Sequence, residues 1–124
     1  MSTQVLTQEG LNRSAQLIMA DISHTAVGTG TNAAVITDSQ LQTETNRLAT
    51  LKTIRDANIL QHRVFFLNSQ MPAPDVKEAG WFMNGTIAAD SGEILARSQF
   101  TFTKGTQDLL LIIEMSIQES ATGT

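Results

Sequence analysis

The sequence predicts a mainly β protein, an antiparallel β-sandwich of about six or seven strands with one N-terminal helix. The chain has 124 residues, a length that suits one domain over residues 1–124. Apolar residues alternate with other residues along 94–102 and 109–117, which is the period of a β-strand. Turn-forming residues recur between such segments at short spacing, as they do in two packed antiparallel sheets.

The single helix is predicted over residues 7–19. Thr7 can cap its first turn, and an apolar stripe on one face carries Leu11, Ala15 and Ile18. A short strand is predicted over 24–27. Residues 38–45 are expected to form either a short second helix or an ordered loop.

From residue 47 onward the pattern is typical of strands. Segments 47–54 and 59–67 flank four turn residues, so together they predict a hairpin. Further strands are predicted over 76–83, 86–88, 94–102 and 109–117.

Apolar side chains occur on both faces of two predicted strands, although the outer face of a small sandwich should be polar. The surplus on the second face consists of Ile59, Phe65, Leu67, Leu110 and Ile112. Trp81 and its neighbour Phe82 point to opposite faces of one strand, so one belongs to the core and Trp81 is a further candidate contact. Because exposed apolar patches usually mark partner surfaces, we expect a homo-oligomer, for which a trimer is one option.

Composition excludes several classes of function. The chain has no cysteine, so it has neither disulfides nor thiolate ligands. Its formal net charge is -4, and a protein that binds nucleic acid through phosphates would carry a basic surplus. No signal peptide is apparent, and the most apolar run, 109–113, is too short to span a membrane. We expect no membrane association, and assembly in the cytoplasm.

Two features could suggest chemistry. Gly28, Gly30 and Ala33 match a loose dinucleotide fingerprint, but that fingerprint needs a helix to open within it, and Val35-Ile36-Thr37 is β-branched. His24 and His62 are the only histidines, with no carboxylates at ligand spacing. We therefore expect no catalytic residue, no cofactor and no metal, and we keep a nucleotide-binding module, or a sugar-binding module that presents Trp81, as alternatives.

Six short motifs, in this order, resemble a family of small bacteriophage virion domains that occur in tail-fibre and baseplate proteins and in related free-standing structural proteins. They are the segments Leu6-Thr7-Gln8-Glu9-Gly10, Ala26-Val27-Gly28-Thr29-Gly30, Leu41 with Glu44 and Arg47, Lys77-Glu78-Ala79-Gly80-Trp81-Phe82, Gly92-Glu93-Ile94-Leu95-Ala96-Arg97, and Phe102-Thr103-Lys104-Gly105 followed by a hydrophobic strand. The segment Met71-Pro72-Ala73-Pro74 and the lack of a long C-terminal shaft depart from the family pattern.

The resemblance implies a role in virion assembly without catalysis, with other virion proteins as partners. Glu78 and Arg97 lie on different predicted strands and can pair across the sheet, and Glu44 and Arg47 can pair with neighbours. Such pairs would fix strand register. We expect a tail-associated protein, a fibre-attachment, collar or baseplate component. A capsid decoration protein that staples capsomers is the alternative, favoured by the short length.

Overall fold

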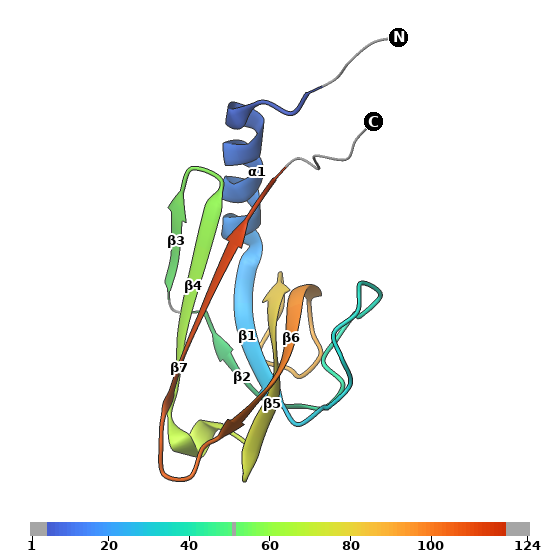
Figure 1. Ribbon diagram of the computed structural model, residues 1–124, viewed down its shortest axis with the longest axis vertical. Helices are drawn as coiled ribbons and strands as arrows, with labels where there is room; N and C mark the ends of the chain where they lie inside the picture. Colours follow the sequence, from blue (N-terminus) through green and yellow to red (C-terminus); the bar gives the residue numbers. More distant parts are fainter. Residues whose placement is uncertain (1–4, 51, 119–124) are drawn as a thin grey trace.

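The computed structural model describes residues 5–50 and 52–118, and its architecture is the predicted mainly β sandwich with one N-terminal helix (Figure 1). The described residues form α1 (Gln8–Asp21), β1 (Ile22–Gly28), β2 (Glu44–Ala49), β3 (Lys52–Asp56), β4 (Ile59–Phe66), the 3-10 turn η1 (Asn68–Gln70), β5 (Asp75–Met83), β6 (Glu93–Thr103) and β7 (Leu109–Ser116). One antiparallel sheet has the order β2-β1-β5-β6, and the other has the order β3-β4-β7.

Helix α1 begins where the sequence predicts. The Gly10 N–H donates to the Thr7 hydroxyl oxygen at 3.2 Å, which is the predicted N-cap. The helix ends at Asp21 and passes directly into β1. It packs against β3 and β4 of the three-stranded sheet, with Ala15 fully buried.

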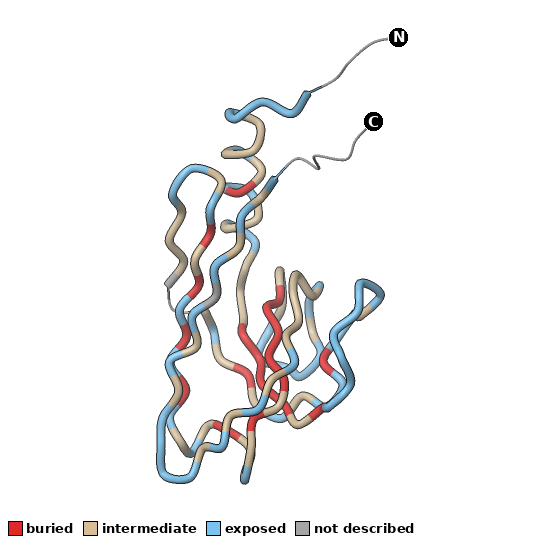
Figure 2. Tube along the Cα trace, in the orientation of Figure 1, coloured by how far each residue is buried: buried red, intermediate tan, exposed pale blue. Residues whose placement is uncertain are grey.

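The main core lies between the two sheets, where the chain trace in Figure 2 is coloured as buried. It contains the buried side chains of Val27, Val64, Phe66, Met71, Val76 and Ala79. Partly buried side chains of β6 and β7 pack around it, among them Phe102 and Leu111. Each sheet therefore turns one apolar face inward, as period-two patterning requires.

The predicted strand over 47–54 is two strands that belong to different sheets. β2 pairs with β1, whereas β3 pairs with β4. The change of sheet follows Thr50, whose N–H still donates to the Ser23 carbonyl at 2.9 Å. Strands that pass from one sheet to the other form the corners of such sandwiches. The apolar pattern is the same before and after this corner, so the pattern does not predict the change of sheet.

Two further expectations were wrong in detail. Residues 86–88 form a loop, because their hydrogen bonds go to Ser91 and Arg47 and not to a neighbouring strand. Ile94 and Phe102 do not share a face of β6. A register shift at Trp81/Phe82 places Ile94 against Phe82, outside the main core.

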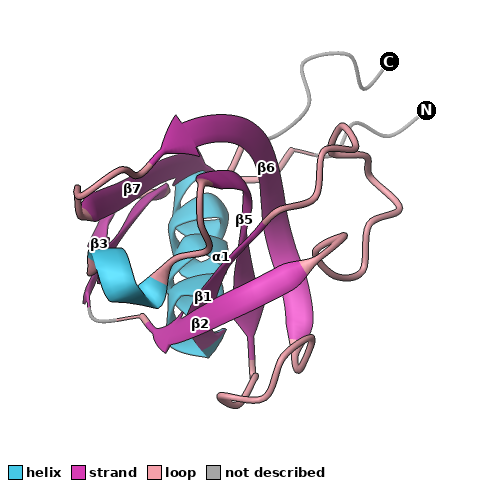
Figure 3. Ribbon diagram, turned by 90° about the horizontal axis from the view of Figure 1, so that it is seen from below, coloured by secondary structure: helices cyan, strands magenta, loops and turns pink. Residues whose placement is uncertain are grey.

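Residues 38–45 are not a second helix: Glu44 begins β2, and the residues before it belong to an ordered loop, 29–43. This 29–43 loop covers the side of the four-stranded sheet that faces away from the main core. Its Leu41 is buried there with Ala26 and Phe82 in a second apolar cluster. In Figures 1 and 3 the loop lies on the side of the molecule opposite β3.

Candidate functional site

The outer face of the three-stranded sheet is the candidate protein-binding surface. β4 alternates strictly: Leu60, His62, Val64 and Phe66 are buried and face inward. The side chains between them face outward. Register pairs Phe65 with Leu110 and Arg63 with Ile112, so these outward residues share one surface. We call this surface the outer face and define its apolar part as Ile59, Phe65, Leu67, Leu110 and Ile112.

Five large apolar side chains on the outer face remain 38% to 52% exposed. All five were identified from the sequence as partner contacts, and the structure gathers them on two adjacent strands, β4 and β7, and the residue that follows β4. Contiguous exposed apolar side chains of this kind are typical of interaction surfaces, so this face is the candidate site. These five side chains are not part of a core, because nothing in the described part of the chain covers them.

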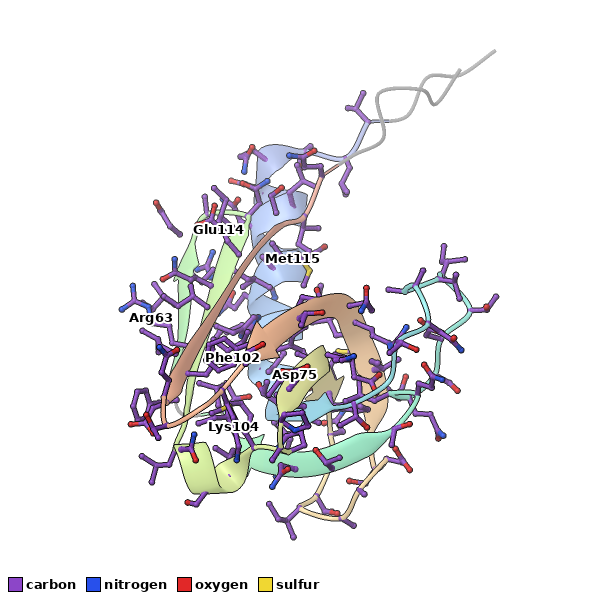
Figure 4. All side chains as sticks on the ribbon, turned by 60° about the horizontal axis from the view of Figure 1, so that its bottom comes forward. Arg63, Asp75, Phe102, Lys104, Glu114 and Met115 are labelled. Carbon is purple, nitrogen blue, oxygen red and sulfur yellow. The ribbon has the colours of Figure 1, made fainter. Side chains whose placement is uncertain are left out.

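Charged and polar side chains lie among the apolar ones. Arg63 and Glu114 are both exposed, and Figure 4 shows Arg63 directed away from the body of the molecule. The Arg63 Nε donates to Gln61 Oε1 at 3.0 Å, and Gln61 is the register partner of Glu114. The two charges of opposite sign can therefore select the orientation of a partner that binds the apolar part.

A hollow of about 460 Å³ opens at one end of the outer face. Its lining residues come from the end of β2, from β4 and the residue that follows it, and from η1: Leu48, Ala49, Phe65, Leu67 and Gln70. We call it the sheet-end hollow. Leu48 and Ala49 were not identified from the sequence as contact residues, because the sheet change after β2 that brings them beside Phe65 was not predicted.

Trp81 is not available to a partner in this structure. Its side chain is 1% exposed, and Phe82 on the opposite face is fully buried as well. The expectation that Trp81 anchors an interface is therefore corrected. The expectation assumed that one face of β5 is open to solvent. The 29–43 loop covers the face that carries Phe82, so neither face of this strand reaches solvent.

Glu78 and Arg97 form a buried ion pair, in which Arg97 Nε donates to Glu78 Oε1 at 3.0 Å. The Glu78 carboxylate also accepts three backbone N–H groups, from Gly30 at 2.7 Å and from Gln42 and Thr43 at 2.8 Å. The carboxylate on β5 thereby holds both ends of the 29–43 loop. Burial alone would raise the pKa of Glu78, but the three backbone donors and Arg97 outweigh burial and lower the pKa below its usual value.

Arg97 extends this anchor along the loop. One guanidinium nitrogen contacts Asp38 Oδ2 at 3.1 Å, and another donates to the Asn32 carbonyl at 2.9 Å. Asp38 in turn accepts the Val35 N–H at 2.9 Å, and this backbone bond, with a contribution from Arg97, lowers the pKa of Asp38. The sequence predicts the pairing of Glu78 with Arg97 because both residues lie on strands. It does not predict the contact of Asp38 with Arg97, because Asp38 lies in a loop that has no strand register.

Glu44 and Arg47 form the second buried ion pair, at 2.8 Å, within β2. Arg47 donates to the Thr86 and Ser91 carbonyls at 3.0 and 2.8 Å, and its guanidinium lies 4.3 Å from the centre of the Phe82 ring. Glu44 accepts the Asp90 N–H at 3.1 Å. The pair thus fastens the 84–92 loop in the way that Glu78 and Arg97 fasten the 29–43 loop.

The Gly28 and Gly30 segment serves this packing. A Cβ on Gly28 would lie 2.1 Å from the Thr43 carbonyl oxygen, and one on Gly30 would lie 2.3 Å from Glu78 Oε2. Both positions need glycine because loop and strand approach closely. The segment leads into a loop instead of a helix, so the geometry that a dinucleotide fingerprint requires is missing here.

His24 and His62 lie in different sheets, on β1 and β4. Burial lowers the pKa of both rings, and for His24 the nearby Arg47 contributes. The His62 Nδ1 lies 3.3 Å from the Thr53 hydroxyl, while its Nε2 is buried without a partner. Within residues 5–50 and 52–118, no three His, Cys, Asp or Glu side chains gather as metal ligands would.

Among the residues described, no helix combines the length and the apolar character needed to cross a membrane. Comparison with known proteins adds no relative: no protein-family model matches the sequence, and no curated protein is significantly similar to it.

Proposed function

We propose that this chain is a non-enzymatic structural protein of a bacteriophage virion, a tail-associated component that binds other virion proteins and further copies of itself. The exposed apolar outer face carries the binding part of this proposal. The virion part rests on the six ordered motifs that resemble small bacteriophage virion domains.

The buried charges support a role in binding over a role in catalysis. Each oxygen of Glu78 accepts two hydrogen bonds, so this carboxylate has little capacity left for a substrate. Glu44 and Arg47 are likewise occupied with each other and with the 84–92 loop. Their common effect is to fix two loops on the sheet, and a loop that is already ordered loses less conformational entropy when a partner binds it.

Substitution of Phe65 by Glu tests the binding surface. Phe65 is 44% exposed, so the variant should fold. Burial of an unpaired carboxylate in an interface should weaken binding about 100-fold, since such a loss of about 3 kcal/mol combines lost apolar burial with desolvation. The matched control is Ile87→Glu, because Ile87 is exposed and apolar but lies in the 84–92 loop, off the outer face.

The assay has two readouts. The first measures binding of labelled wild type and variants to separated tail and head fractions of the phage that encodes the chain. The second locates the chain on intact particles with an antibody and gold labelling. We expect tail binding that Phe65→Glu removes and Ile87→Glu keeps. Label over the whole head would replace the tail assignment by capsid decoration, and particles without label would contradict the virion assignment altogether.

A further inference from the structure

The outer face carries exposed charges of both signs among its apolar side chains. Arg63 lies on β4 and Glu114 on β7, and both are exposed (Figure 4). Neither side chain takes part in any of the ion pairs that the described residues form with one another. Two opposite charges that are not paired within the chain are available to a partner that offers the same two charges in return.

Arg63 holds a rare position in an acidic chain. The formal net charge is -4. Among the residues whose exposure the structure describes, seven carboxylates are exposed, whereas the exposed cationic side chains are Arg13 and Arg63 alone. Copies of such a chain repel one another unless a cation in the contact meets a carboxylate of the other copy. Arg13 lies on α1, so Arg63 is the cation that the outer face supplies for this purpose.

The side chain of Arg63 bends towards the row of the sheet that contains Glu114. Its Nε donates to Gln61 Oε1 at 3.0 Å, and Gln61 is the register partner of Glu114. A twofold axis along the strands, between β4 and β7, lays β4 of one copy over β7 of the other. Gln61 then lies over the second copy's Glu114, and the Arg63 guanidinium lies beside the same carboxylate. Symmetry repeats the contact, because both copies use the same surface in an isologous interface.

The same axis places apolar groups against each other. Phe65 and Leu110 are register partners, so Phe65 of each copy lies over the second copy's Leu110. Arg63 and Ile112 are register partners as well. The aliphatic stem of Arg63 therefore covers the second copy's Ile112, while its charged end reaches the carboxylate. One orientation thus satisfies the exposed apolar side chains and both charges.

The size of the outer face indicates a weak contact. β4 has 8 residues, so the three-stranded sheet measures about 27 Å along its strands and about 14 Å across them. The resulting area, about 400 Å² in plan, is smaller than the roughly 800 Å² that each partner contributes to a standard interface. In a contact of this size, two charge pairs have a measurable effect on affinity and decide the orientation.

We propose that the outer faces of two copies bind each other about a twofold axis, with Arg63 of each copy paired to Glu114 of the other. This inference rests on the proposed function, because it names a second copy of the chain as the partner of the outer face. It also identifies the two residues that determine which orientation the partner takes.

Charge reversal tests this pairing. Arg63→Glu and Glu114→Arg are prepared as full-length proteins, and sedimentation over a range of concentrations gives the dissociation constant of each protein and of their equal mixture. Both positions are exposed, so both variants should fold, and the fluorescence of buried Trp81 checks that they do. Each variant alone brings two pairs of like charges into the contact and should associate about tenfold more weakly than the wild type.

The equal mixture should recover the affinity of the wild type. In the mixed dimer one copy contributes two carboxylates and the other contributes two guanidinium groups, so both pairs are again of opposite sign. The double variant, which carries both substitutions in one chain, should recover association for the same reason.

The net charge separates this pairing from general repulsion. Glu114→Arg moves the net charge of -4 towards zero, so reduced repulsion between whole molecules would strengthen association, whereas the twofold pairing predicts a weaker one. The matched controls are Arg13→Glu on α1 and Glu93→Arg at the start of β6, which are exposed positions off the outer face. They change the net charge by the same amounts and should associate within about twofold of the wild type.

Other outcomes overturn the pairing in distinguishable ways. A mixture that associates no more tightly than the single variants, or a Glu114→Arg variant that associates more tightly than the wild type, would contradict it. A wild type that stays monomeric at every concentration, while Phe65→Glu still loses binding to tail fractions, would contradict the twofold contact and keep the proposed function. The proposed function itself fails if Phe65→Glu binds tail fractions as well as the wild type does.

Discussion

Glu78→Gln should destabilise the protein strongly, although the substitution changes only one atom and one charge. Glu78 is fully buried and accepts four donors, two on each oxygen. A glutamine side chain keeps one oxygen and points an NH₂ group at the other two donors. It also leaves the Arg97 guanidinium, whose side chain is 3% exposed, with Asp38 as its remaining carboxylate.

Removal of one partner from a buried ion pair costs about 3–5 kcal/mol. We expect a value of about 3 kcal/mol, because the 29–43 loop lies at the surface and can shift to admit water. For a chain of this length that loss corresponds to a melting temperature lower by roughly 10 °C. Urea and thermal unfolding, followed by the fluorescence of the single tryptophan, measure both quantities.

Glu93→Gln is the matched control, because Glu93 is an exposed carboxylate at the start of β6 and the change in net charge is the same. Its free energy of unfolding should stay within about 0.5 kcal/mol of the wild type. If Glu78→Gln also stayed within about 1 kcal/mol of the wild type, the ion pair would not anchor the loop as argued.

Two predictions concern pH. The pKa of Glu78 is lowered from an ordinary value of 4.5. Its contribution to stability is therefore present above pH 4.5 and is lost as the pH falls towards the lower pKa of the folded state. The urea midpoint of the wild type should fall more steeply in acid than that of Glu78→Gln, and parallel curves would contradict this. Burial lowers the pKa of His62 from 6.5, so the neutral ring is favoured in the folded protein, and stability present above pH 6.5 is lost as the pH falls below it. His62→Leu should remove that part of the pH dependence, and an unchanged slope of unfolding free energy between neutral pH and about pH 5 would show that another group is responsible.

The fold class and most strands could be predicted because their evidence is local. Alternation along β4 and β7 predicts which side chains face inward. The side chains predicted to face outward, among them Phe65, Leu67 and Leu110, are exposed in the structure. Thr7 identified the start of α1 because capping depends on neighbouring residues alone.

The features that sequence reasoning missed depend on contacts between distant segments. Trp81 shares a face of β5 with Ala79 of the main core, while the 29–43 loop covers the opposite face at Phe82, and alternation within β5 does not predict that cover. The sheet change after Thr50 and the register shift at Trp81/Phe82 are likewise set by the neighbouring strands. Val35 and Ile36 read as apolar loop residues, but only the bonds of Asp38 and Arg97 show that they are held in place.

We propose that the outer face of the three-stranded sheet binds protein. The most direct measurement is the solution mass of the wild type and of Phe65→Glu across a range of concentrations, by sedimentation. We predict that the wild type associates as concentration rises, whereas Phe65→Glu stays monomeric with Trp81 still buried. Equal masses for the two proteins at every concentration would contradict self-association through this face.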